Sequence, residues 1–380
     1  MLKINMTQAK KLLPAYIAAD KPVMLWGGPG IGKSGLARAV ANIMGHELQD
    51  FRLLMREAVD VHGLPKDNGN GRMTWVYPEE IALASDDLPE KRIMFLDEIN
   101  AAPSSVQTVA YQMLHERAID NKALHKNLRF LAAGNRETDG AVANRMPTPL
   151  ANRFGHIEVS ADSESFVNWG SMNNVHPFVL SHIENSPQDL VVKSSKEYTS
   201  QKAFPSPRSW ENASTVMRVL EAGRDLSDVG VIDDLTDVVA SFVGEGIAAN
   251  FRGYVQIGSK LPRTIDVVQG KAKAKKYELH EQYFISCGVL AYLNELRNWL
   301  VTHQPETSYA KTEKFSLYVD NTLKFCKDSF DAETLASFIG RFCHKDWYGF
   351  QFNPASAIQK EWAAWAFSGK EGAAALVFAN

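Results

Sequence analysis

The sequence predicts an α/β fold for about the first 160 residues, a parallel sheet sandwiched by helices, with helical regions after it. Short apolar runs typical of buried parallel strands alternate with helical segments as far as about residue 160. From about residue 161 the alternation stops and helical patterns continue. We therefore expect an α/β domain at 1–160, an all-α domain at 161–260, and a helical C-terminal region at 261–380 of unknown role.

The chain is expected to begin with a helix, a strand and a second helix. Met6–Ala19 has amphipathic helical spacing, and Thr7 is a plausible N-cap. Pro22–Trp26 is a short apolar run typical of a buried strand, and Gly35–Met44 again has helical spacing.

A phosphate loop lies between that strand and the second helix. Gly27–Ser34 matches the complete pattern G-x-x-x-x-G-K-[ST], in which backbone N–H groups surround phosphates. Lys33 would reach the outer phosphates and Ser34 would offer a hydroxyl to Mg²⁺. The alternative, a glycine-rich turn that caps a helix, gives these two side chains no purpose. The expected nucleotide contacts are Gly27, Gly28, Pro29, Gly30, Ile31, Gly32, Lys33, Ser34 and Gly35.

An acidic pair follows a second predicted strand. Arg92–Asp97 has four apolar residues bounded by charge, typical of a central strand buried on both faces. Its carboxyl end would bring Asp97 and Glu98 toward the phosphate loop, which is the Walker B arrangement. We expect Asp97 to hold Mg²⁺ and Glu98 to polarise the attacking water. The alternative is a solvated acidic turn.

Three further polar residues are candidates for the same site. Leu128–Asn135 is an apolar strand whose terminal Asn135 could orient the water alongside Glu98. Arg153 lies between a helix end and a strand, and Arg208 lies near the start of a helix. A guanidinium can stabilise the charge that develops on a transferred phosphoryl group. Arginines on helices are more often solvated or paired with carboxylates, so neither is assigned on its own.

Two hairpins are predicted inside the α/β domain. The first, at about 60–78, has strands Val61–Pro65 and Met73–Tyr77 around an Asn/Gly-rich turn. The second, at about 116–126, comes just before the Asn135 strand. On the residues alone, ordinary surface hairpins are the favoured interpretation of both, because loops vary freely.

The rest of the chain is expected to be helical. The candidate helices are Ser163–Trp169, His176–Ile183, Ser209–Ala222, Ile232–Phe251, Glu278–Val301, Lys311–Phe330 and Asp331–Cys343. Aromatic residues gather in Asp346–Phe352 and Trp362–Phe367, where we favour packed core over a partner surface.

Composition disfavours several other classes of protein. The net charge of −3 gives no broad basic field for nucleic acid, and the basic run Lys271–Lys276 is more typical of a solvated helix face. Three scattered cysteines fit reduced thiols. No apolar run reaches the roughly 18 residues of a membrane span, and the N-terminus lacks a signal-peptide pattern. We expect a cytoplasmic protein that does not bind membranes.

The order of these motifs resembles the AAA+ ATPases, and within them the MoxR group of the dynein-related AAA subfamily. The likeness spans about the first 210 residues and is carried by Asp60–Pro65, Trp75–Pro78, Asp97–Pro103, Ala132–Asp139, Arg145–Pro147 and Leu150–Phe154. It implies that Asn135 is the sensor-1 residue, Arg153 the arginine finger supplied to a neighbouring subunit, and Arg208 the sensor-2 contact. Arg145 also matches and would be a second arginine acting in trans.

The same resemblance implies how the protein works. It predicts an ATP- and Mg²⁺-dependent ring, usually a hexamer, with residues 161–260 as its lid and both hairpins facing the axis. Such a ring remodels or activates protein clients, often with a separate partner that carries a von Willebrand A (VWA) domain. The alternatives are a nucleic-acid motor and a GTP-using restriction-type motor, because the loop contacts phosphates and not the base.

Overall fold

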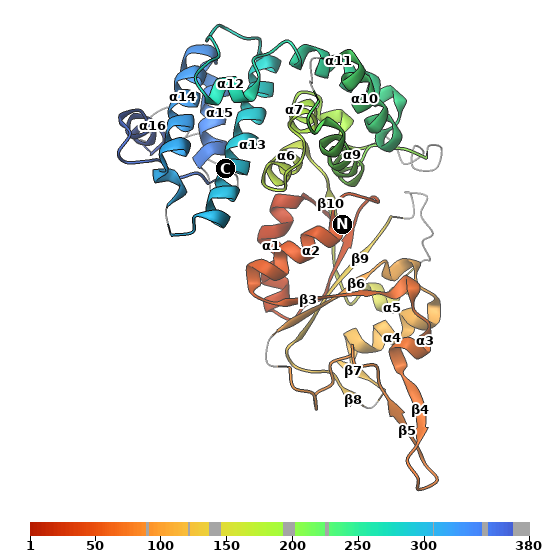
Figure 1. Ribbon diagram of the computed structural model, residues 1–380. Coiled ribbons are helices and arrows are strands. Elements are labelled where there is room, and N and C mark those ends of the chain that lie inside the picture. Colours follow the sequence, from red (N-terminus) through yellow and green to blue (C-terminus); the bar gives the residue numbers. More distant parts are fainter. Residues whose placement is uncertain are drawn as a thin grey trace. The chain divides into compact units, whose positions relative to one another are not determined.

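The computed structural model describes residues 1–88, 91–120, 122–136, 146–192, 202–224, 228–306, 308–343 and 349–367. This described chain divides into two compact units (Figure 1). The first contains Met1–Asp162, the described residues of Val192–Lys202, and Ser206–Arg208. The second contains Ser163–Val191, Ala203–Pro205 and the described residues from Ser209 onward. The expected division into parts at 1–160, 161–260 and 261–380 stays a prediction.

A parallel sheet forms the centre of the first unit. Within the described residues it has six strands, in the order β1 (Leu2–Asn5), β10 (Gly155–Ser160), β2 (Val23–Trp26), β9 (Leu128–Gly134), β6 (Arg92–Asp97) and β3 (Glu47–Arg52). Each neighbouring pair is parallel. The predicted α/β fold class is confirmed. Because β2, β9 and β6 are parallel neighbours, their carboxyl ends lie along one edge of the sheet.

Helices cover both faces of the sheet because successive strand residues point to opposite sides. Leu25 and Phe95 belong to the buried cluster that includes α1 (Met6–Ala18) and α2 (Lys33–Met44). Met24 and Leu96 belong to the opposite cluster, which includes residues of α3 (Ala58–His62), α4 (Ser104–His115) and α5 (Thr148–Ala151). Each such side chain contributes about 1.5–3 kcal/mol when fully buried, so both layers stabilise the sheet.

The first helix is capped by a different residue than predicted. The Asn5 side chain accepts a hydrogen bond from Gln8 N at 2.8 Å, and Gln8 Oε1 accepts one from Asn5 N at 3.1 Å. This reciprocal capping box satisfies two donors at the helix start, whereas Thr7 already lies inside the helix. The assignment of Thr7 as the N-cap was wrong.

Two antiparallel hairpins project from the described part of this unit. The first pairs β4 (Leu64–Asp67) with β5 (Met73–Val76), and the second pairs β7 (Ala118–Ile119) with β8 (Lys122–Ala123). The first strand begins at Leu64 instead of Val61, because Val61 is a fully buried residue of α3. All eight residues of β4 and β5 are exposed.

The second unit is helical in its described residues. Its helices are α6 (Ser163–Met172), α7 (Pro177–Asn185), α9 (Pro207–Glu221, whose first two residues belong to the first unit), α10 (Val229–Val243), α11 (Glu245–Gly258), α12 (Thr264–Val268), α13 (Leu279–His303), α14 (Glu313–Ser329), α15 (Ala332–Cys343) and α16 (Ala357–Phe367). The single helix predicted at Ile232–Phe251 is wrong. Gly244, with φ of 95° and ψ of 153°, ends α10 and begins α11, because that left-handed φ interrupts the helical path.

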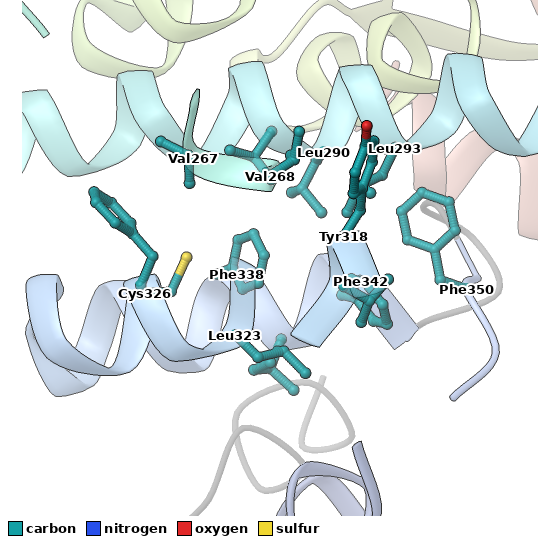
Figure 2. Close-up of a cluster of buried hydrophobic side chains, with 14 of the residues drawn as sticks. Val267, Val268, Leu290, Leu293, Tyr318, Leu323, Cys326, Phe338, Phe342 and Phe350 are labelled. Carbon is teal, nitrogen blue, oxygen red and sulfur yellow. The ribbon is translucent and has the colours of Figure 1, made fainter. Parts of the chain in front are cut away.

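A large apolar core joins α12, α13, α14 and α15. Figure 2 shows Val268, Leu290, Leu323 and Phe338 from these four helices around the same interior. Phe350 is also buried there, and so is Trp362 of α16, as the preference for packed core predicted. Part of the aromatic run, residues 346–348, lies outside the described residues.

The cysteines are free thiols, and burial raises the pKa of Cys287, of Cys326 and, to about 12, of Cys343. They therefore stay protonated near neutral pH. Among the described residues, no helix is both long and apolar enough to cross a membrane.

A buried ion pair fastens α15 to α7. The Arg341 guanidinium donates to both carboxylate oxygens of Glu184, and these side chains are only 12% and 15% exposed. The Cys287 thiol also donates to Glu184 Oε2 at 3.6 Å. A charge left unpaired at this depth would be costly.

Replacing Arg341 tests this anchor. Arg341→Met should lower the free energy of unfolding by about 3 kcal/mol, because it leaves Glu184 buried without its cation. Lys327→Met, which breaks the exposed Lys327–Glu361 pair, should cost less than about 1 kcal/mol. Urea denaturation followed by circular dichroism measures both variants. Equal losses in the two would contradict the anchoring role of Arg341.

Candidate active site

Polar residues from three strands meet at the carboxyl edge of the sheet. The phosphate loop leaves β2 after Trp26, Asp97 ends β6, and Asn135 follows the last residue of β9. The order β2–β9–β6 makes these strands immediate neighbours. Motifs about 100 residues apart in the chain are therefore adjacent in the fold.

Lys33 connects the phosphate loop with Asn135. Its ammonium group donates to Gly27 O at 2.8 Å, to Gly28 O at 3.0 Å and to Asn135 Oδ1 at 2.8 Å. The structure thus brings together the predicted loop lysine and the predicted amide of β9. An ammonium held by neutral oxygens keeps its full charge for an anionic group.

Ser34 and Asp97 form the second link between the loop and its neighbours. Ser34 Oγ donates to Asp97 Oδ2 at 3.1 Å, so a hydroxyl and a carboxylate share one location. Mg²⁺ prefers such oxygen ligands and usually takes only one or two from a protein, with water and phosphate completing its shell. These residues fit Mg²⁺. Among the described residues, no group of three or more His, Cys, Asp or Glu could hold a metal ion by itself.

The loop backbone requires glycine at two positions. Gly30 has φ of 74° and Gly32 has φ of 100°, a region that residues with a side chain rarely adopt. Gly32 is the N-cap of α2, which begins at Lys33, two residues earlier than the predicted Gly35. The first N–H groups of a helix lack partners in the preceding turn, so a helix N-terminus at Lys33 favours an anion.

Glu98 has a strained backbone. Its φ of 56° and ψ of 32° place a non-glycine residue in the left-handed region. Its N–H donates to Asp97 Oδ1 at 3.0 Å, so the Asp97 carboxylate supports this turn. Such a conformation costs about 1–3 kcal/mol and is common at functional sites. It ends β6 and starts the short turn Ile99–Ala101 that leads into α4.

Asn100 is a site residue that sequence analysis missed. Its side chain is buried and its Nδ2 donates to Asn135 O at 2.8 Å, so it fixes the backbone of the predicted water-orienting amide. Gly134 leaves the space for this contact, because a Cβ there would collide with Asn100 Oδ1 and with Met24 Cε. The signal in the sequence was an amide two residues after the acidic pair.

The three candidate arginines differ in their positions relative to the phosphate loop. Arg208 lies beside the loop, since its backbone N–H donates to Gly30 O at 3.1 Å, and its side chain is exposed. Arg153 is also exposed, and its described contacts are with Tyr111 and His115 of α4. Arg145 lies outside the described residues. A single copy of the chain therefore brings Arg208, but not Arg153, into contact with the loop.

Residues 23–160 match the family AAA, "ATPase family associated with various cellular activities". The match runs from β2 to β10 and includes the loop, Asp97, Glu98, Asn135 and Arg153.

Several curated proteins are similar in sequence. Midasin of Giardia intestinalis is 28% identical over 186 residues, which are 45% of this chain and 4% of Midasin. The Holliday junction branch migration complex subunit RuvB of Sulfurimonas denitrificans is 25% identical over 286 residues, 71% of this chain and 74% of that protein. The formate hydrogenlyase transcriptional activator FhlA of Escherichia coli is 27% identical over 132 residues, 33% of this chain and 19% of FhlA. This chain thus spans only a small part of Midasin and of FhlA.

Solved structures are similar at a low level. The RuvB Holliday junction branch migration motor of Thermotoga maritima has a TM-score of 0.35 and 15% identity, and the match covers 78% of this chain and 76% of that one. The family match coincides with the strands and loops that build the site, and residues 23–160 are similar to the ATPase domains of the AAA family.

Proposed function

We propose that this chain works as an ATP-hydrolysing ring of the MoxR type that remodels or activates a protein client. The observation that carries the ATPase proposal is the position of Lys33, whose ammonium contacts both the phosphate loop and Asn135. The Ser34–Asp97 contact supports a metal position next to it. Nucleotide, metal and water would then share one sheet edge.

The proposed reaction is in-line hydrolysis of ATP. Glu98 accepts a proton from the attacking water, whose oxygen bonds to the γ-phosphorus, and the bond to the β–γ bridging oxygen breaks to give ADP and phosphate. Lys33 stabilises charge on the phosphate oxygens, and Asn135 orients the water. Ser34 and Asp97 would hold Mg²⁺, which supplies charge neutralisation at the phosphates.

A shared site between subunits is the basis of the proposed ring. Arg153 is exposed and lies against α4 of its own subunit, which supports a role at the ATP of a neighbouring copy. Arg208 lies next to Gly30 of its own loop, which supports a sensor role in the same copy. We propose a hexamer, with Arg145 as a second arginine in trans, by resemblance to the MoxR group.

The protein client is proposed from the first hairpin and from the resemblance. Leu64, Met73, Trp75 and Val76 are between 43% and 65% exposed on β4 and β5. Clustered apolar side chains at a surface are typical of interaction sites. A separate partner with a VWA domain and a cytoplasmic location complete the proposal, and both rest on the resemblance.

A nucleic-acid motor is the second candidate function. The sequence similarity to RuvB favours it, because that match covers 71% of this chain. The net charge of −3 speaks against it, since backbone contacts to nucleic acid require many Lys and Arg side chains. A preference for GTP over ATP is a further alternative that turnover with each nucleotide distinguishes.

Substitutions of Lys33 and Glu98 should separate binding from hydrolysis. Lys33→Ala removes the loop cation and should weaken ATP binding by about 100-fold or more. Glu98→Gln should bind ATP normally and lower kcat by about 100-fold or more, because an amide cannot accept the proton of water. Nucleotide titration and phosphate release measure these effects. Wild-type turnover by Glu98→Gln would remove Glu98 from the proposed role.

Substitution of Asn100 should affect ATP turnover more than ATP binding. Asn100→Ala removes the hydrogen bond that fixes the Asn135 backbone, so kcat should fall about tenfold while the Kd for ATP stays close to that of the wild type. Thr108→Ala at an exposed position of α4 is the control, because the Thr108 hydroxyl donates to the backbone of Ser104 in its own helix. A Kd that weakens as much as kcat falls would show that Asn100 supports the whole loop instead.

Nucleic acid should neither bind tightly nor stimulate the ATPase. Binding to duplex and branched DNA is measured at two salt concentrations, together with phosphate release in their presence. We expect weak binding and unchanged turnover. Steeply salt-dependent binding with a stimulated ATPase would favour the second candidate.

A further inference from the structure

Two aromatic side chains of α4 hold the Arg153 guanidinium. Arg153 Nη2 lies 3.1 Å from His115 Nε2, and its Cζ lies 5.9 Å from the centre of the Tyr111 ring. The two rings are 5.3 Å apart, one helical turn from each other. A guanidinium can only donate hydrogen bonds, so His115 Nε2 is the acceptor in this contact.

Among the described residues, most other arginines have a carboxylate partner within 4.0 Å, and Arg153 has no carboxylate within that distance. The paired arginines are Arg52, Arg56, Arg92, Arg117, Arg129, Arg136, Arg218, Arg224, Arg252, Arg263 and Arg341. A carboxylate would neutralise the guanidinium and compete with phosphate for it. An imidazole nitrogen that accepts a hydrogen bond and the face of an aromatic ring orient the guanidinium without a carboxylate to neutralise it.

The backbone that carries Arg153 is fixed independently. His156 Nε2 donates to Ala151 O at 2.8 Å, and Trp26 Nε1 donates to His156 Nδ1 at 2.9 Å. Arg153 N donates to Leu150 O at 3.0 Å, and Phe154 is buried. The chain on both sides of Arg153 is therefore anchored, and the exposed side chain takes its direction from α4.

We propose that His115 and Tyr111 are positioning residues that hold Arg153 in the conformation in which it meets the triphosphate of a neighbouring copy. This inference rests on the proposed shared site. An arginine that stabilises the transition state contributes several orders of magnitude in rate, and only when it is correctly placed. A freely rotating Arg153 would spend less time in that placement, so turnover falls while ATP binding does not change.

Single substitutions test the two contacts. His115→Ala should lower kcat about tenfold at unchanged Kd for ATP, and His115→Gln should restore most of the loss because its amide oxygen also accepts a hydrogen bond. Tyr111→Leu should lower kcat about fivefold, whereas Tyr111→Phe keeps the ring and should stay near the wild type. Thr108→Ala is the control on the same helix. Equal losses in the Gln and Ala variants of His115 would overturn the positioning role.

Mixed rings show in which subunit His115 acts. Lys33→Ala subunits should bind ATP about 100-fold more weakly but still offer Arg153, and Arg153→Ala subunits bind ATP but need an arginine, so their mixture should regain activity. Adding His115→Ala to the Lys33→Ala subunits should lower the regained turnover about tenfold. Adding it to the Arg153→Ala subunits should have no effect, because those subunits hold no arginine to position.

The outcomes of the mixing experiment are distinguishable. If the first mixture regains no activity, the shared site fails and the inference fails with it. If the mixture regains activity but His115→Ala lowers it equally in either subunit, or in neither, the shared site stands and the positioning role of His115 is wrong. Circular dichroism melting curves of each variant confirm that it folds.

Discussion

The hydrogen bonds of Lys33 are the interaction on which the site depends. One ammonium group joins two carbonyls of the phosphate loop to the amide of Asn135, and so ties the ends of β2 and β9 together. A partly buried cation needs such oxygen partners, because desolvation without them is costly. These three partners are neutral oxygens, and the ammonium group that they hold is the cation proposed to meet the outer phosphates.

The parallel sheet brings Lys33 and Asn135 together. With strands in the order β2–β9–β6, the three polar chain segments emerge at one edge, and helices on both faces keep that edge rigid. The segment from Glu98 to His115 then runs without a break from the acidic pair, through a short turn, into α4. Residues at its start belong to the subunit's own site, and residues at its end hold the arginine proposed for the neighbour.

The sequence predicted the strands and motif residues because these signals are local. Apolar runs identified β2, β6 and β9, and the glycine pattern identified the loop. Features set by contacts between distant residues were not predictable. Asn100 meets Asn135 across 35 residues, and Arg153 meets His115 across 38. Even the local break at Gly244 was missed, because a glycine within a helical pattern does not reveal its φ.

The close packing around Gly134 leaves no space for a larger residue. A Cβ atom at position 134 would collide with the side chains of Asn100 and Met24. Even one methyl group there must therefore displace these side chains, and Asn100 is the one that supports Asn135. A substitution of Gly134 by alanine, which adds one carbon atom, would therefore disturb the position of Asn135. Such a variant would still carry the phosphate loop, Asp97, Glu98 and Asn135, so an inspection of motifs alone would not reveal the change.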